Sequence, residues 1–100
     1  IKTRGEKVSP KEVENVLYSM QGILEAAVIG VNDPMLGQAV KAFVALEDGA
    51  ALTENDILAY CRSKLEDNFV PKYVEIMDSL PKTESGKIRK SSLMEYSSQA

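Results

Sequence analysis

Two stretches of nearly continuous apolar, β-prone residues constrain the fold of this 100-residue chain most strongly. Residues 26–31 are almost entirely apolar, as expected for an inner strand of a sheet. Residues 39–46 predict a second strand, and the sequence Asn-Asp-Pro at 32–34, followed by Gly37, predicts a turn between the two. Because the connection is short, the two strands are expected to pair antiparallel. The core of the chain is therefore expected to form around a sheet.

Helix signals lie on both sides of these strands. Residues 9–12 (Ser-Pro-Lys-Glu) form a capping box with proline at the first helical position, and the apolar stripe that follows predicts a helix ending near Gly22. Thr53 predicts the N-cap of a second helix. A third strand is expected over 73–77 and a short last helix over 90–96. We therefore predict a small α+β domain, with a three-stranded sheet covered by helices and an N-terminal loop or short hairpin.

Composition is that of an ordinary globular domain, with 44% hydrophobic and 27% charged residues. The chain has no histidine, and its one cysteine, Cys61, falls on the apolar stripe of the second helix and is expected in the core. A zinc site, a histidine-based triad and an internal disulfide are therefore excluded within this sequence. A lone cysteine is typical of a cytoplasmic protein, and no apolar run approaches the roughly 20 residues of a membrane span. The start at Ile1 leads us to expect a piece of a longer protein.

The net charge of −3 conceals two basic ends on an acidic body. Residues 1–11 and 82–90 each carry a local charge of +3, whereas residues 12–81 carry 4 basic and 12 acidic side chains. If the two ends meet in the folded chain, they would attract a phosphate or a carboxylate; otherwise they are two solvated lysine-rich loops. Nucleic-acid binding is not expected, because the acidic body would repel a phosphate backbone.

Two segments contain residues that a structural role alone does not explain. In the first, Gly5 lies between charged residues just before the first helix, where glycine permits positive φ or a close approach of the backbone to a ligand. In the second, Pro81 and Gly86 present Lys87 at a loop tip, with Ile88 placed to anchor the base. An ammonium group on a long stem suits phosphate or carboxylate oxygens. A plain turn and an exposed turn lysine are the alternative interpretations, and a P-loop is excluded because Pro81 stands where its first glycine is required.

Together the two segments resemble the C-terminal domain of the adenylate-forming superfamily, which includes acyl-CoA synthetases, luciferases and peptide-synthetase adenylation domains. Residues 1–14 match the family's opening I-K-x-x-G-x-x-(V/I)-x-P-x-E-(V/I)-E at every fixed position. Residues 80–90 match its closing L-P-(K/R)-T-x-(S/T)-G-K-(I/V)-x-(R/K). Residues 31–38 and 70–71 resemble the segments between them, so the likeness covers essentially the whole chain.

The resemblance implies a reaction in two steps. A carboxylic acid attacks the α-phosphate of ATP, giving an acyl-adenylate and pyrophosphate, and a thiol, usually that of coenzyme A, then displaces AMP. It further implies that residues 1–100 are the mobile C-terminal lid of an ATP-dependent acid–thiol ligase, an acyl- or aryl-CoA synthetase, with Lys87 as the catalytic residue of the first step. Thr83, Ser85 and Gly86 would support that lysine.

The resemblance also assigns the second step to the opening segment. Arg4, Gly5, Glu6 and Lys7 would line the passage for the pantetheine arm of coenzyme A. Mg²⁺ would accompany ATP, and both would be bound mainly by a larger N-terminal domain, which is this chain's partner. That domain would also select the carboxylic acid. The lid alone is therefore expected to be inactive. Residues 85–90 favour a CoA synthetase over a peptide-synthetase adenylation domain or a luciferase-like enzyme, and a non-catalytic phosphate-binding module is the alternative from another class.

Lys82 and Lys90 share the charge and the loop of Lys87 but not its motif position. Their replacement is therefore expected to have a small effect on catalysis.

Overall fold

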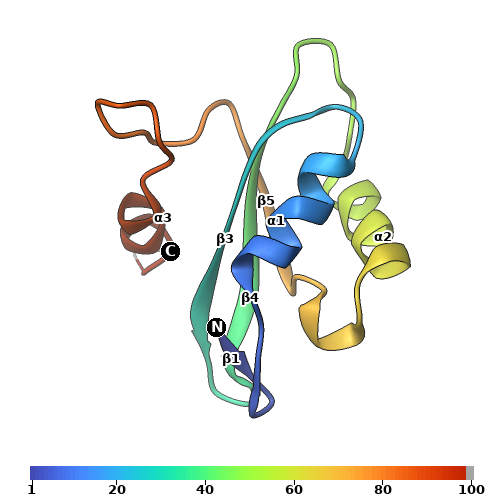
Figure 1. Ribbon diagram of the computed structural model, residues 1–100, viewed down its shortest axis with the longest axis vertical. Coiled ribbons are helices and arrows are strands. Elements are labelled where there is room, and N and C mark those ends of the chain that lie inside the picture. Colours follow the sequence, from blue (N-terminus) through green and yellow to red (C-terminus); the bar gives the residue numbers. More distant parts are fainter. Residues whose placement is uncertain (99–100) are drawn as a thin grey trace.

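A mixed sheet built on two long antiparallel strands forms the centre of the fold, which the structure, a computed structural model, describes for residues 1–98 (Figure 1). The predicted three-stranded sheet covered by helices is confirmed, and an N-terminal hairpin adds two short strands to it. The strands are β1 (Lys2–Thr3), β2 (Glu6–Lys7), β3 (Ile23–Asp33), β4 (Gly37–Leu46) and β5 (Tyr73–Met77). The helices are α1 (Pro10–Ser19), α2 (Glu54–Lys64) and α3 (Lys90–Ser98), with a short 3-10 helix, η1 (Asp67–Phe69).

β4 is the central strand. Along one edge it pairs antiparallel with β3, from Leu46 opposite Ile23 to Gly37 opposite Asp33. Along the other edge it pairs in parallel with β5, because α2 carries the chain back between the two strands. The first residue of β4, Gly37, also pairs with Thr3 of β1. The N-terminal hairpin therefore lies beside the turn that joins β3 to β4, at one end of the sheet.

Both faces of the sheet are covered, which explains the continuous apolar run at residues 26–31. α1 and α2 pack on one face, while α3 and the chain before it pack on the other (Figure 1). Alternate residues of β3 enter two separate clusters, so that Ala26 and Val28 join the first and Ala27 and Ile29 the second. The first cluster includes Val13 and Leu17 of α1 with Ile57 and Cys61 of α2, and the second includes Phe43, Leu80 and Leu93.

The helix starts follow the capping signals. The Ser9 hydroxyl accepts the N–H of Glu12 at 3.4 Å. Thr53 and Asp56 form a reciprocal capping box at α2, with N···O distances of 2.9 and 3.1 Å. α1 ends earlier than expected, at Ser19 and not near Gly22, because the backbone of the next residue is already extended. Gly22 instead lies in the turn that leads into β3.

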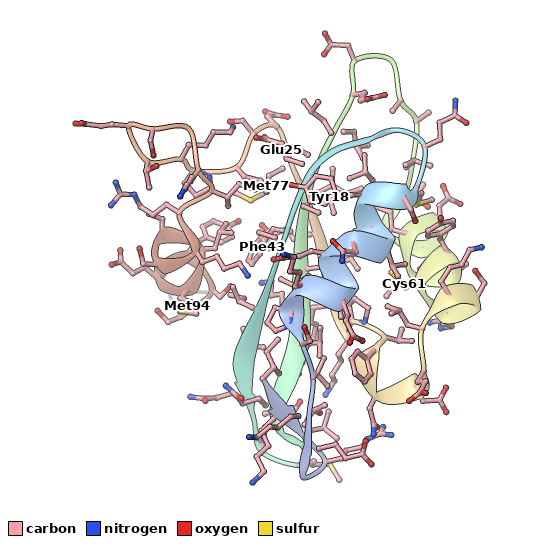
Figure 2. All side chains as sticks on the ribbon, viewed as in Figure 1. Tyr18, Glu25, Phe43, Cys61, Met77 and Met94 are labelled. Carbon is pink, nitrogen blue, oxygen red and sulfur yellow. The ribbon has the colours of Figure 1, made fainter. Side chains whose placement is uncertain are left out.

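Cys61 is a core residue, as the helix pattern predicts. Its side chain is fully buried between α2 and the sheet (Figure 2). Burial raises the pKa of the thiol to about 11, so it stays protonated near neutral pH and is a poor nucleophile.

The last helix is confirmed and runs slightly beyond the expected residues 90–96. Leu93 is buried against the sheet, whereas Met94 is half exposed on the outer side of α3 (Figure 2). Within residues 1–98, no helix combines the length and apolar character needed to cross a membrane.

Candidate functional site

The segment that carries Lys87 is a tight hairpin, held by apolar packing at its base and by backbone pairing between its two arms. Leu80 and Ile88 pack into the cluster beneath α3 and anchor the base. The amide of Arg89 donates to the carbonyl of Pro81 at 2.8 Å, and Lys82 forms an isolated antiparallel bridge with Ile88. The expected anchoring role of Ile88 is confirmed.

Three residues that the sequence assigns to the supporting loop meet at this tip. The Thr83 hydroxyl accepts the N–H of Lys87 at 3.2 Å and lies 3.0 Å from the Ser85 hydroxyl. The Thr83 amide donates to the Lys87 carbonyl at 2.7 Å, so Thr83 holds both backbone groups of that lysine. Gly86 closes the turn at a φ of 87°, a conformation that side chains disfavour, and its amide donates to the Thr83 carbonyl. The backbone of Lys87 is thus fixed while its side chain extends outward.

The ammonium group of Lys87 is available to a ligand. Its side chain is exposed, and Lys87 takes part in none of the ion pairs of residues 1–98. A groove of about 460 Å³ separates the loop from α1 and the start of β3, with Tyr18, Leu24 and Gly86 among its lining residues. A fixed backbone with a free cation at a groove is suited to an anionic oxygen.

The two lysines that flank Lys87 are not free. The Lys82 ammonium lies 2.6 Å from a carboxylate oxygen of Glu25, at the start of β3 (Figure 2). The Lys90 ammonium lies 2.8 Å from a carboxylate oxygen of Glu14 on α1, and the same oxygen accepts the N–H of Val28 at 2.8 Å. The loop is therefore tied to both α1 and β3. From the sequence, Lys82 and Lys90 were expected only to share the charge of the loop. In the structure, each forms an ion pair with a carboxylate outside the loop.

We expect Lys82→Ala and Lys90→Ala each to lower the free energy of unfolding by roughly 0.2–1 kcal/mol, as partly exposed ion pairs do. Lys11→Ala is the matched control, because Lys11 is exposed and lies in no ion pair of the described residues. Urea unfolding of the four proteins would measure the difference. Equal midpoints for all of them would show that the ties contribute nothing to stability.

The other predicted segment is the β1–β2 hairpin. Its two central residues, Arg4 and Gly5, have φ values of 52° and 80°, the positive pair typical of a type I′ turn. Arg4, Gly5, Glu6 and Lys7 are all exposed, and a side chain built at Gly5 would meet nothing within 4 Å. Glu6 accepts a hydrogen bond from the Asn68 amide at 2.6 Å, which ties the hairpin to η1.

A groove of about 590 Å³ runs beside this hairpin. Three cationic side chains, Arg4, Arg62 and Lys72, line it together with apolar Leu36 and Val70. Such a mixed lining can hold a ligand that has an anionic part and an apolar part.

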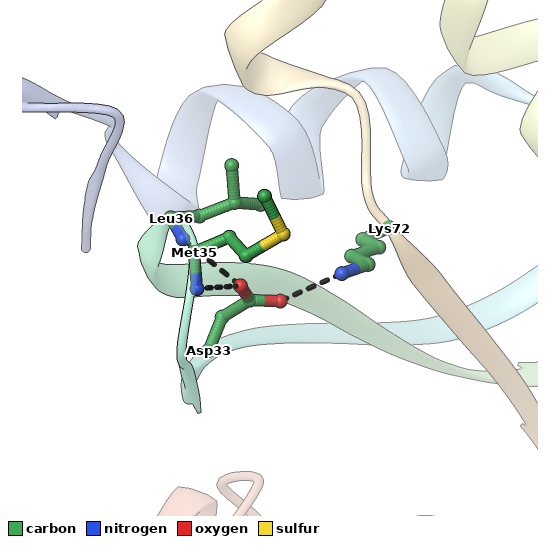
Figure 3. Close-up of polar contacts among 4 residues, drawn as sticks. All are labelled: Asp33, Met35, Leu36 and Lys72. Atoms are coloured by element: carbon green, nitrogen blue, oxygen red, sulfur yellow. Dashed lines mark hydrogen bonds and ion pairs between the residues drawn. The ribbon is translucent and has the colours of Figure 1, made fainter.

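Asp33 supports the β3–β4 turn that contacts this hairpin, a role that the sequence pattern did not reveal. Asp33 was recognised as part of a turn, but its carboxylate is almost fully buried, with 4% of the side chain exposed. One oxygen accepts the N–H groups of Met35 and Leu36, each at 2.9 Å, and the other lies 2.7 Å from the Lys72 ammonium (Figure 3). The hydrogen bond from Lys72, followed by the two backbone hydrogen bonds, lowers the pKa of Asp33 to about 2.

This lowered pKa predicts a loss of stability in acid. The pKa of an unperturbed aspartate is 3.8 and that of Asp33 in the fold is about 2, so the charged form stabilises the fold above pH 3.8. That contribution is lost as the pH falls toward 2. We expect the wild-type chain to be more stable than Asp33→Asn at pH 7, and the two to converge near pH 2. Urea unfolding across this range tests it, and a difference independent of pH would contradict it.

Comparison with known proteins identifies the family. The profile of the AMP-binding enzyme C-terminal domain matches residues 12–87. The chain belongs to this family. Over 86 residues it is 48% identical to a feruloyl-CoA synthase from an Amycolatopsis species, covering 86% of this chain and 18% of that protein. It is also 41% identical over 93 residues to a crotonobetaine/carnitine–CoA ligase of Salmonella arizonae, covering 93% of this chain and 18% of that protein.

Solved structures agree with this assignment. The apo structure of MatB from Rhodopseudomonas palustris superposes with a TM-score of 0.93 at 35% identity, covering 99% of this chain and 20% of that one. This AMP-binding C-terminal domain thus spans about a fifth of the proteins it matches.

The domain keeps the two predicted sites apart. The Lys87 loop is tied to Glu25 at the start of β3, whereas the β1–β2 hairpin lies beside Asp33 at its end. The two positions are eight residue steps apart along the strand, a distance of about 26 Å. Figure 1 shows the two loops at opposite ends of the molecule. The two basic ends therefore do not form a common anion site.

Within residues 1–98, no three side chains of the metal-ligating types gather in one place.

Proposed function

We propose that this domain is the mobile catalytic lid of an ATP-dependent acid–thiol ligase that forms an acyl-adenylate and then an acyl-CoA thioester. The observation that carries the proposal is that the Lys87 loop and the Gly5 hairpin are held at opposite ends of one continuous strand, β3. Because the strand positions that hold them, Glu25 and Asp33, are about 26 Å apart, only one of the two loops can reach a given site at a time. The domain would therefore rotate between the two steps.

In the first step, Lys87 is the catalytic residue. A carboxylate oxygen of the acid bonds to the α-phosphorus of ATP while the bond to pyrophosphate breaks, and negative charge builds on the phosphate oxygens. A preorganised cation in a site that excludes water stabilises that charge. Thr83, Ser85 and Gly86 support this role, since they fix the Lys87 backbone and leave its ammonium to reach the phosphate.

In the second step, the hairpin replaces the lysine. The thiol of coenzyme A attacks the acyl carbon of the adenylate, and AMP leaves with the electron pair of the broken bond. Arg4, Gly5, Glu6 and Lys7 would border the passage of the pantetheine arm. The open space around Gly5 supports a long thiol as the substrate, and Arg4 and Arg62, which form no ion pair among the described residues, support a phosphorylated one.

The substrate-binding pockets of the proposed enzyme would lie in its N-terminal domain. The matched relatives are about five times longer than this chain, and we assign the adenine, phosphate and acyl pockets to a larger N-terminal domain. Mg²⁺, held there with ATP, would neutralise phosphate charge. We place the enzyme in the cytoplasm, as the single cysteine led us to expect.

Separate assays of the two half-reactions in the full-length protein test the proposal. ATP–pyrophosphate exchange with a panel of carboxylic acids measures adenylate formation, and release of AMP on adding coenzyme A measures thioester formation. Exchange without transfer to coenzyme A would favour an adenylation domain that serves a carrier protein. No exchange with any acid would favour a phosphate-binding module.

We expect the isolated chain to fold but to be inactive. The side-chain caps of α1 and α2 and both core clusters are formed by residues within 1–98, while the nucleotide pocket would lie elsewhere. Circular dichroism with a thermal melt and an exchange assay on the same sample provide the measurement. A cooperative melt without exchange is the expected result. Robust exchange by the isolated chain would overturn the assignment of the nucleotide pocket to the N-terminal domain.

A further inference from the structure

We propose that Asp33 is a positioning residue for the thioester-forming step, because its carboxylate fixes the β3–β4 turn on which the Gly5 hairpin rests. This inference depends on the proposed function of the hairpin. It gives a role to a residue that touches neither the Lys87 loop nor Gly5 itself.

The first link is between Asp33 and the turn. Its Oδ1 accepts two successive backbone N–H groups, those of Met35 and Leu36, in the pattern by which aspartate stabilises a turn. Its Oδ2 accepts from Lys72, which is 39 residues away and immediately precedes β5 (Figure 3). The Lys72 amide also donates to the carbonyl of Val40 on β4, at 2.9 Å. The carboxylate therefore joins the turn to the body of the sheet.

The second link is between the turn and the hairpin. The carbonyl of Leu36 accepts the N–H of Arg4 at 2.9 Å, and Gly37 pairs with Thr3. Arg4 is the residue next to Gly5, so a hydrogen bond of the turn acts directly at the tip that faces the proposed passage. β1 and β2 are only two residues each, and an isolated two-stranded hairpin is at best marginally stable. The hairpin therefore depends on contacts with the rest of the fold, and the turn supplies those at Thr3 and Arg4, while Asn68 holds Glu6.

The third link concerns selectivity. Asp33 lies at the end of β3 and Glu25, which holds the Lys87 loop, lies near its start. The loop has its own anchors in Leu80 and Ile88. A disturbance of the β3–β4 turn should thus move the hairpin and leave Lys87 in place.

The test compares Asp33→Ala and Asp33→Asn with the wild type in the full-length protein, in both half-reactions. A misplacement of about 1 Å can cost roughly 10²-fold in rate, and we expect a loss of that order in thioester formation for Asp33→Ala at saturating coenzyme A. Asp33→Asn keeps an acceptor for the turn amides and should fall between it and the wild type. Adenylate formation should stay close to the wild-type rate in both variants.

Glu75→Gln is the matched control. It breaks another lysine–carboxylate pair of the same sheet, Lys41–Glu75 at 3.4 Å, away from the hairpin. We expect it to change neither half-reaction. Equal losses of both half-reactions in the Asp33 variants, or no loss in either, would overturn the positioning role.

Amide hydrogen exchange in the same full-length proteins tests the contact without relying on activity. The amides of Arg4, Met35 and Leu36 should exchange faster in Asp33→Ala, while that of Gly86, bonded within the Lys87 loop, should not change. Unchanged exchange at Arg4 would overturn the inference. If the wild-type protein forms adenylate but no thioester, the proposed function fails. If the wild type catalyses both half-reactions but the Asp33 variants show no selective loss of thioester formation, only the positioning role of Asp33 fails.

Discussion

Replacing Lys87 by alanine in the full-length protein should slow adenylate formation by roughly 10²–10³-fold, the usual cost of losing one preorganised charge at a developing oxyanion. Thioester formation from preformed acyl-adenylate should be nearly normal, because in the proposed rotation Lys87 has left the site. Stability should change little, since the side chain is exposed and forms no ion pair among the described residues. The measurement is the rate of each half-reaction, started separately.

Arg89→Ala is the control that the structure favours for this experiment. Arg89 carries the same charge two residues away, is exposed, and holds the loop through its backbone amide, which the substitution preserves. Lys82 and Lys90 are less suitable, because each is tied to a carboxylate of the sheet or α1. If Arg89→Ala is as damaging as Lys87→Ala, or if Lys87→Ala keeps full adenylation activity, only a general basic patch remains.

Replacing Gly5 by tryptophan should have the opposite effect. Adenylate formation should be spared, and thioester formation should fall by about 10²-fold or more, since a large side chain would displace the incoming thiol from its line of attack. Nothing within the described residues lies within 4 Å of the position that a Cβ would take. The obstruction is therefore expected only when the partner domain closes the passage.

The backbone at Gly5 calls for a second variant. Its φ of 80° disfavours any side chain, so a loss in Gly5→Trp could come from strain in the hairpin. Gly5→Asn separates the two causes, because asparagine tolerates positive φ and is small. A large loss in Gly5→Trp with a mild loss in Gly5→Asn would support obstruction. Equal losses in both variants would show that the turn conformation alone matters.

The sequence predicted the elements well where their signals are local. The apolar run at 26–31 located β3, but the strand extends from Ile23 to Asp33. Polar Glu25, Asn32 and Asp33 interrupt the apolar run at its two ends, so the pattern does not reveal that the strand continues through them. They are in the strand because β4 supplies hydrogen-bonding partners along nearly its whole length. Pairing with β4 thus determines where β3 begins and ends. A pattern within residues 23–33 alone cannot predict those ends, because it does not include the partner strand.

The same distinction applies to the candidate site. Lys87 and Gly5 lie in contiguous motifs, so a resemblance was enough to predict their roles, which stay predictions until the half-reactions are measured. The contacts that hold the two loops join residues far apart in sequence, such as Asp33 and Lys72. The turn preference of Asp33 was readable in Asn-Asp-Pro. Its burial and its ammonium partner depended on the packing of β5 against β4.

The continuous β3–β4 pair has a consequence for how such domains can vary in length. Every residue added to both strands would push the hairpin about 3.3 Å further from the Lys87 loop, and an odd number would also exchange the two apolar faces. An insertion in the exposed turn between β4 and α2, residues 47–49, would leave both loops where they are. Length variation in functional relatives should therefore gather in that turn and avoid the strands, since the span between the two loops must match the partner domain in both orientations.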